Sequence, residues 1–304
     1  MNSQIRSLIK RSLPHRAIET LRPLRNLPRT LEKQRTQRIF AAATDSPPSL
    51  DINALATLQM KYHRRPERAY DADTLENRGM ARAAQILRFP EALKATDFLE
   101  LGCWDGMVSC CLCRKGKKAT AVDNRDVGFD ERASQEGVRL LQMNAADLQL
   151  EDESFDFVFS YDAFEHFVSP EDVLREAIRV VRNGGYIYLE FGPLYYSPLG
   201  EHAYRSITVP YCQFLFTREV MNDFTAEKGL ITINFNHVNG WSIESYRELW
   251  NKYSDVLKKV RYHEAIDLSQ LNLISAYPSC FKSKSNCFDN FIVSRISILF
   301  QKSS

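Results

Sequence analysis

Short apolar runs alternate with stretches of helical periodicity through residues 96–304. The apolar runs predict strands at 97–102, 118–124, 154–162, 186–193, 230–238 and 288–301, with a further short strand inside 138–147. Strands that alternate with helices form βαβ units. The pattern therefore predicts an α/β fold with a mostly parallel sheet and right-handed crossovers.

Residues at their ends support two of the predicted helices. The stretch 71–89 has apolar residues at helical spacing and offers Asp71 or Asp73 as its N-cap. The stretch 169–185 places acids in its first turn and arginines in its last, with Gly184 as the predicted C-cap.

The first 40 residues alternate Leu and Ile with ten Lys or Arg against two acids, a formal charge of +8, whereas the rest of the chain carries −6. Pro14, Pro23 and Pro28 predict that no continuous helix covers this segment. Residues 1–48 are interpreted as a basic extension and linker, and 49–95 as a helical cap region. Three roles stay open for the extension: a loosely ordered tail, attachment to an anionic membrane surface, or a transit peptide.

The cysteine pattern indicates reduced thiols rather than a disulfide framework. The count of seven is odd, and Cys110, Cys111 and Cys113 crowd beside a predicted buried strand. Paired C-x-x-C motifs and interleaved histidines do not occur, so no metal site is predicted. No run approaches the ~18 apolar residues of a membrane span, and no apolar core marks a secretory signal. A cytoplasmic location is expected, with peripheral membrane contact through the basic segment as an addition.

The stretch LELGCWDG, residues 99–106, joins the first predicted strand to a helix through a glycine turn. Gly102 and Gly106 bracket the turn, and Glu100 precedes it at the end of the strand. Asp123 ends the next strand, 21 residues after Gly102, where an acid can bind two ribose hydroxyls. Together these residues predict an adenosine-type ligand across the carboxyl ends of the strands.

A dinucleotide matches this turn poorly. The pyrophosphate fingerprint needs glycines at the positions of Trp104 and Met107. Residues 99–109 also contain no Lys or Arg to offset a diphosphate, whereas Glu100 suits a ligand with positive charge. S-adenosylmethionine carries an ammonium and a sulfonium, so the residues favour this methyl donor over NAD.

Four segments, in order, resemble the motifs of class I S-adenosylmethionine-dependent methyltransferases, most closely the small-molecule, type 11-like branch. They are FLELGCWDG, AVDNRD, NAADLQLEDESFDFVFSYDAFEHF and VLREAIRVVRNGGYIYLEFGP, which cover about residues 96–192. The resemblance implies a Rossmann-like, mostly parallel seven-stranded sheet with helices on both faces and an antiparallel last strand. It also implies a methyltransferase domain over 96–304, with lid inserts at 193–216 and 240–288 and S-adenosylmethionine as the cofactor.

The resemblance assigns cofactor contacts to the loops that follow the first four strands. They are Glu100, Gly102, Cys103, Trp104 and Gly106 in the glycine turn, Asp123 and Asn124 at the ribose, Ala146 and Asp147 at the adenine, and Ser160 and Tyr161 beside the methionine. Trp104 departs from the family's glycine, and its indole either covers the cofactor or packs in the core. Glu100 has an alternative role as a cap on the following helix.

Acceptor chemistry is expected beyond the fourth and fifth strands. Transfer from a sulfonium is an in-line displacement that depends on alignment, and a hydroxyl acceptor additionally needs a base. His166 and His202 are the predicted catalytic residues, each with a purely structural role as its alternative. The aromatic residues of 193–216 favour a small-molecule, glycan or lipid-precursor acceptor, with an ordinary hydrophobic cap as the alternative.

The sequence thus predicts an enzyme that methylates a hydroxyl or amine. Nucleic acid is disfavoured as a partner because the body is acidic and the basic tail lacks interleaved aromatics. Two other functions stay open: an NAD-linked oxidoreductase and a catalytically silent binding protein with the same fold. The pattern predicts no oligomeric state.

Overall fold

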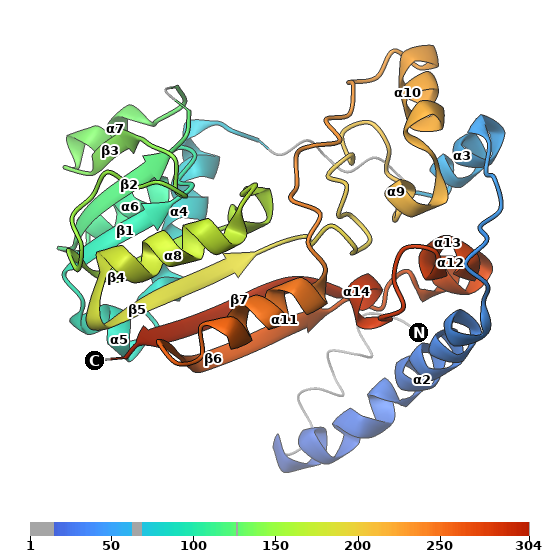
Figure 1. The fold of residues 1–304 in the computed structure, drawn as a ribbon, viewed down its shortest axis with the longest axis horizontal. Helices are drawn as coiled ribbons and strands as arrows, with labels where there is room; N and C mark the ends of the chain where they lie inside the picture. Colours follow the sequence, from blue (N-terminus) through green and yellow to red (C-terminus); the bar gives the residue numbers. More distant parts are fainter. Residues whose placement is uncertain (1–14, 63–68, 126, 304) are drawn as a thin grey trace. The chain divides into compact units, whose positions relative to one another are not determined.

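The computed structural model describes residues 15–62, 69–125 and 127–303, which fall into two compact units. One unit holds the described residues up to Pro48 together with Leu268–Phe288. The other unit runs over Ser49–Asp267 and resumes at Asp289. This second unit contains the sheet (Figure 1).

The sheet has seven strands in the order β3-β2-β1-β4-β5-β7-β6. Their bounds are β1 Asp97–Leu101, β2 Lys118–Asp123, β3 Arg139–Gln142, β4 Phe155–Tyr161, β5 Val181–Phe191, β6 Leu257–Ile266 and β7 Val293–Lys302. The first five strands pair in parallel, whereas β7 is antiparallel to both β5 and β6. The predicted mostly parallel seven-stranded sheet with an antiparallel last strand is confirmed.

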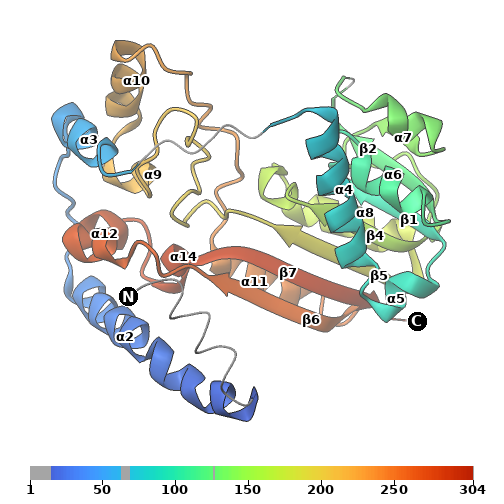
Figure 2. The same ribbon diagram turned by 180° about the vertical axis from the view of Figure 1, so that it is seen from behind.

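Helices cover both faces of the sheet, as predicted. In the two ribbon views α8 and α11 lie on one face, and α4 and α6 on the other (Figure 1, Figure 2). The helices of this unit are α3 Ile52–Gln59, α4 Ala72–Ile86, α5 Pro90–Lys94, α6 Met107–Cys113, α7 Glu131–Gln135, the 3₁₀ turn η1 Phe164–His166, α8 Pro170–Val180, α9 Cys212–Leu215, α10 Arg218–Glu227, α11 Ile243–Lys252 and α14 Asp289–Ile292.

Of the two predicted helix ends, one is confirmed and the other is wrong. Asp71 is the N-cap of α4, and its Oδ1 accepts a hydrogen bond of 3.0 Å from Thr74 N, as expected. The predicted C-cap of α8 is wrong, because α8 ends at Val180 and Gly184 lies within β5. Sheet pairing takes over at Val181, which is in register with Phe155 of β4.

The sixth strand, predicted at 230–238, is also wrong, since this segment is irregular. The strand in its place is β6, which pairs along β7 from within the predicted insert 240–288. Most β6 side chains are exposed or half-buried. An edge strand of this kind carries little of the apolar pattern that marks a buried one.

The other unit is built on the long helix α2, His15–Ala42, with α12 Leu271–Ala276 and α13 Pro278–Lys282. The Phe40 and Phe288 rings lie 5.5 Å apart between centroids. The predicted break of the helix is wrong at Pro23 and Pro28, because α2 continues through both. A proline removes one backbone hydrogen bond of a helix and bends it, but it does not always end the helix.

Residues 1–14, with Pro14, lie outside the described residues, so the proposed roles of the basic extension stay predictions. No helix within 15–62, 69–125 or 127–303 is both long and apolar enough to cross a membrane.

Candidate cofactor and acceptor site

The glycine turn lies at the carboxyl end of β1, where it needs residues without a side chain. Gly102 has φ of 72°, and a Cβ built on it would lie 2.6 Å from Cβ of Ala163. Gly106, with φ of 77°, is the N-cap of α6. The N–H groups of Gly102 and Cys103 donate to Val122 O at 2.9 and 3.0 Å, which ties the turn to β2. Larger residues at 102 would therefore displace the turn.

Glu100 is buried beneath the turn and faces the first turn of α6. Its Oε2 accepts hydrogen bonds from Ser109 N at 3.2 Å and from Ser109 Oγ at 2.6 Å. The structure thus gives Glu100 the helix-capping role that was its alternative, and a contact with the ligand stays a prediction. Burial raises the pKa of the Glu100 carboxyl to about 8, against the opposing effect of the Ser109 hydrogen bonds.

We expect Glu100 to make the ligand-free protein less stable as pH rises from about 4.5 to about 8. Between these values the folded state holds a proton that the unfolded state has lost, so the free energy of unfolding falls with pH, by on the order of a few kcal/mol in all. Glu100→Gln should flatten this dependence in urea unfolding measured across the window. Glu151→Gln, at an exposed position, should leave the profile unchanged. An unchanged slope in Glu100→Gln would contradict the expectation.

Asp123, the last residue of β2, is the predicted ribose ligand and is only 8% exposed. Its Oδ2 accepts from Trp104 N at 2.9 Å, and its Oδ1 accepts from Arg125 N at 3.2 Å and from Arg125 Nε at 2.8 Å. A carboxylate has about four acceptor positions. Binding both ribose hydroxyls would therefore require the Arg125 side chain to move.

Trp104 is 50% exposed, so the alternative that its indole packs in the core is wrong. The guanidinium of Arg125 lies 3.8 Å from the centroid of the indole, and the ring of Tyr70 lies 6.3 Å away. The indole is thus an exposed flat surface at the mouth of the turn. Its contact with the cofactor remains a prediction.

The residues predicted for the adenine follow β3, beside Asp123. Met143 N donates to Asp123 O at 2.7 Å, which joins this loop to the end of β2. Ala146 N donates to Asn144 Oδ1 at 3.0 Å, while Asp147 is exposed. Asn124 is exposed as well. The glycine turn, Asp123 at the end of β2 and this loop all lie at the carboxyl ends of the parallel strands. This arrangement fits an adenosine-type cofactor.

The side chains of three other predicted cofactor residues are engaged within the protein. Ser160 is fully buried, and its hydroxyl donates to Leu101 O at 2.9 Å, which links β4 to β1. The Tyr161 hydroxyl makes hydrogen bonds to Gln85 Oε1 at 2.7 Å and Glu190 Oε1 at 3.0 Å. Cys103 is buried, and burial raises the pKa of its thiol. This thiol is therefore a packing group rather than a nucleophile.

Arginines of α4 and β7 hold this edge together, and sequence reasoning missed them. Arg78 pairs with Asp105 inside the glycine turn, and Arg82 pairs with Asp162, which follows β4. Arg295 of β7 also pairs with Asp162. The available signal was the spacing of Arg78 and Arg82, four residues apart on one face of a predicted helix.

Three histidines meet where the loops after β4 and β5 come together. The ring centroids of His166 and His202 lie 5.0 Å apart, and that of His237 lies 4.4 Å from His166 and 5.6 Å from His202. Burial lowers the pKa of His166 and lowers that of His202 to about 4. The two predicted catalytic histidines are therefore neighbours, and sequence reasoning missed the third.

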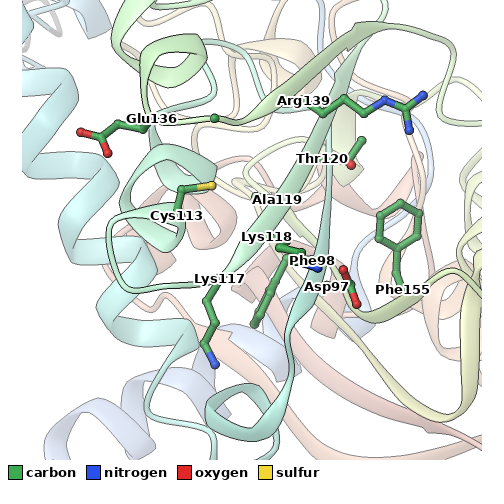
Figure 3. Close-up of a pocket in the computed structure, with 11 residues that line it drawn as sticks. Asp97, Phe98, Cys113, Lys117, Lys118, Ala119, Thr120, Glu136, Arg139 and Phe155 are labelled. Atoms are coloured by element: carbon green, nitrogen blue, oxygen red, sulfur yellow. The ribbon is translucent and has the colours of Figure 1, made fainter.

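A hollow of about 400 Å³ lies at the opposite edge of the sheet (Figure 3). Its lining includes the first residues of four parallel strands, namely Asp97, Lys118, Arg139 and Phe155. In an open parallel sheet ligands bind outside the carboxyl ends of the strands. This hollow at the amino ends is thus separate from the predicted cofactor site.

Comparison with known proteins finds relatives for part of the chain. Residues 99–189 match a family model described as a methyltransferase domain. Two curated proteins of Mycobacterium tuberculosis, from strains CDC 1551 / Oshkosh and ATCC 25618 / H37Rv, are named probable S-adenosylmethionine-dependent methyltransferases. Each is 29% identical over 143 residues, which are 46% of this chain and 51% of the relative. The chain thus spans about half the length of the curated relatives it matches.

Solved structures also resemble this chain. A protein of Pyrococcus horikoshii OT3 is 15% identical over 77% of this chain and 93% of its own, with a TM-score of 0.48. A SAM-dependent methyltransferase of Methanosarcina mazei is 18% identical over 68% and 92%, with a TM-score of 0.42. Residues 99–189, which run from β1 into β5, thus match the methyltransferase-domain family, and the curated relatives of this stretch are named for S-adenosylmethionine as their cofactor.

Proposed function

We propose that the protein transfers a methyl group from S-adenosylmethionine to a hydroxyl or amine of a small molecule, glycan or lipid precursor. The observation that carries this proposal is the group of histidines beside the carboxyl ends of β4 and β5. These histidines lie at the sheet edge that also bears the glycine turn. Bound S-adenosylmethionine supplies a methyl group already activated on a sulfonium.

The chain's own residues would hold the cofactor along that edge. Asp123 would accept the ribose hydroxyls once Arg125 moves, and the exposed indole of Trp104 would lie over the mouth of the turn. Asp147 would meet the adenine amino group. Alignment of donor and acceptor then supplies much of the rate enhancement, because the donor is already activated.

For a hydroxyl acceptor, His166 is the stronger candidate for the base. A base works best when its pKa is near the working pH. His202, whose pKa is lowered to about 4, holds a proton poorly at neutral pH. His166 Nδ1 lies 2.6 Å from His237 O, so as the neutral ring it donates there and keeps Nε2 free to accept a proton.

The aromatic residues of 193–216 give the acceptor class no further support. The rings of Tyr195 and Tyr196 lie 5.7 and 5.4 Å from that of Phe214, and the Phe214 ring lies 5.6 Å from that of Phe291. These rings pack on one another, which supports the alternative of a hydrophobic cap. The proposal of a hydroxyl acceptor therefore rests on the histidines.

The proposal is tested by formation of S-adenosylhomocysteine with panels of small hydroxyl and amine compounds, sugars and lipid precursors. We expect acceptor-dependent product, and a kcat about 100-fold or more lower in His166→Ala. His263→Ala, at an exposed position on β6, should keep the original rate. A cofactor that binds without turnover on any panel would instead favour the catalytically silent binding protein.

A further inference from the structure

We propose that His166, His202 and His237 form a binding site for a divalent transition-metal ion, with Zn²⁺ as its representative. Each histidine offers one ring nitrogen, and these three nitrogens lie within 4.8 Å of one another. Tetrahedral zinc, with Zn–N of about 2.0–2.1 Å, spaces its ligand nitrogens by roughly 3.4 Å. Binding would therefore draw the three rings slightly closer together.

Hydrogen bonds to the main chain already fix two of the rings for coordination. His166 Nδ1 lies 2.6 Å from His237 O, and His202 Nε2 lies 3.0 Å from Pro193 O. A carbonyl oxygen only accepts, so the neutral ring donates from that nitrogen and leaves its other nitrogen with a free lone pair. Ligating histidines in metal sites are oriented by the same kind of bond.

A buried carboxyl group lies beside the histidines. Glu165 is 2% exposed, and its Oε2 has no hydrogen-bond partner in the described part of the chain. Its Oε1 accepts from Gly192 N at 3.0 Å and lies 3.9 Å from His166 Nε2. A buried carboxylate is costly unless a cation is near it. A dication on the adjacent imidazoles would supply that compensation.

The backbone at the group is also held in an unusual conformation. His202 is one of the non-glycine residues with positive φ, at 56°. Residues held in this region cost free energy and are found preferentially at binding and active sites. The ring that this conformation presents is one of the three that face each other.

The position of the site deepens the proposed function, on which its consequence for the acceptor rests. With the ion bound, His166 Nε2 is a ligand, and the ion takes over the activation of the hydroxyl that was proposed for His166 as a base. His237 is exposed, so the group opens to solvent. Three protein ligands leave a fourth position for water or an acceptor oxygen, as in catalytic zinc sites. An ion there would lower the pKa of a bound hydroxyl, so that the acceptor loses its proton to solvent or a nearby base.

The test is direct metal binding by the full chain, stripped with a chelator and titrated with ZnCl₂ in a calorimeter. We expect one equivalent to bind with micromolar or tighter affinity. His202→Ala and His237→Ala should each weaken binding by at least about 100-fold, whereas His263→Ala should leave it unchanged. Because His237 is exposed, its replacement should keep the fold, which circular dichroism checks for each variant.

Absence of zinc binding, or binding that survives both histidine variants, would overturn the site. Titration of the same preparations with S-adenosylhomocysteine separates this result from the proposed function. A protein that binds the cofactor product but no zinc retains the methyltransferase proposal and loses the metal site. A protein that binds zinc through these histidines but never turns over retains the site and loses the proposed function.

Discussion

Replacing Asp123 by alanine is expected to weaken binding of S-adenosylhomocysteine by about 100-fold or more. The carboxylate would accept two hydroxyl hydrogen bonds from the ribose. Hydrogen bonds to a charged group contribute about 1.5–3 kcal/mol each, and 1.4 kcal/mol corresponds to a factor of ten. Calorimetric titration of the purified protein, with NAD as the comparison ligand, measures the change.

Arg125→Ala is the matched control, because Asp123→Ala also frees Arg125 and the N–H of Trp104. In the structure Arg125 occupies Oδ1 of Asp123 through two hydrogen bonds. Its removal keeps the carboxylate, so binding should persist or become tighter. Loss of binding in Arg125→Ala to the same degree would mean that the shape of the loop matters rather than the acid.

The outcome with the unaltered chain also decides between the functions left open. Binding of NAD alone would contradict the assignment of the cofactor and favour an oxidoreductase. Binding of neither ligand would favour a catalytically silent fold in which the Arg125 side chain stays hydrogen-bonded to the Asp123 carboxylate. Binding of S-adenosylhomocysteine that depends on Asp123 would support the ribose contact.

The fold was predictable from sequence where strands are buried. β1 and β4 are almost wholly buried, so their apolar runs are continuous and mark them without ambiguity. β6 was missed because its exposed edge carries Lys258, Lys259 and Arg261. The run at 230–238 has enough apolar residues for a strand but is irregular in the fold.

The site was predictable only where local sequence determines it. Gly102, Gly106 and Asp123 follow β1 and β2 at fixed offsets along the chain, so the fold places all three at the carboxyl ends of the strands. The histidine group has no such offset, since His166, His202 and His237 come from three separate loops. Only tertiary structure shows that they meet, which is why the sequence predicted no metal site.

Replacing Asp162 by alanine is expected to lower the free energy of unfolding by about 2–4 kcal/mol. Arg82 and Arg295 pair with opposite oxygens of this carboxylate, and the Asp162 side chain is only 19% exposed. Without it, Arg82 loses its carboxylate partner, and Arg295 keeps only Glu190 at 3.8 Å. Alanine also fits the φ of 52° at this position less well than aspartate does. Urea unfolding measures the loss.

Two further variants separate the effect of the Asp162 charge from that of the backbone conformation. Asp162→Asn tolerates the same backbone conformation and should still lose most of that stability. Asp152→Ala breaks an ion pair with Arg179 in which the Asp152 side chain is 73% exposed. It should lower the free energy of unfolding by no more than about 1 kcal/mol. Equal, small losses in all three variants would show that solvent already screens the pair at Asp162. A large loss should also weaken binding of S-adenosylhomocysteine, because Arg82 shares α4 with Arg78, which holds Asp105 of the glycine turn.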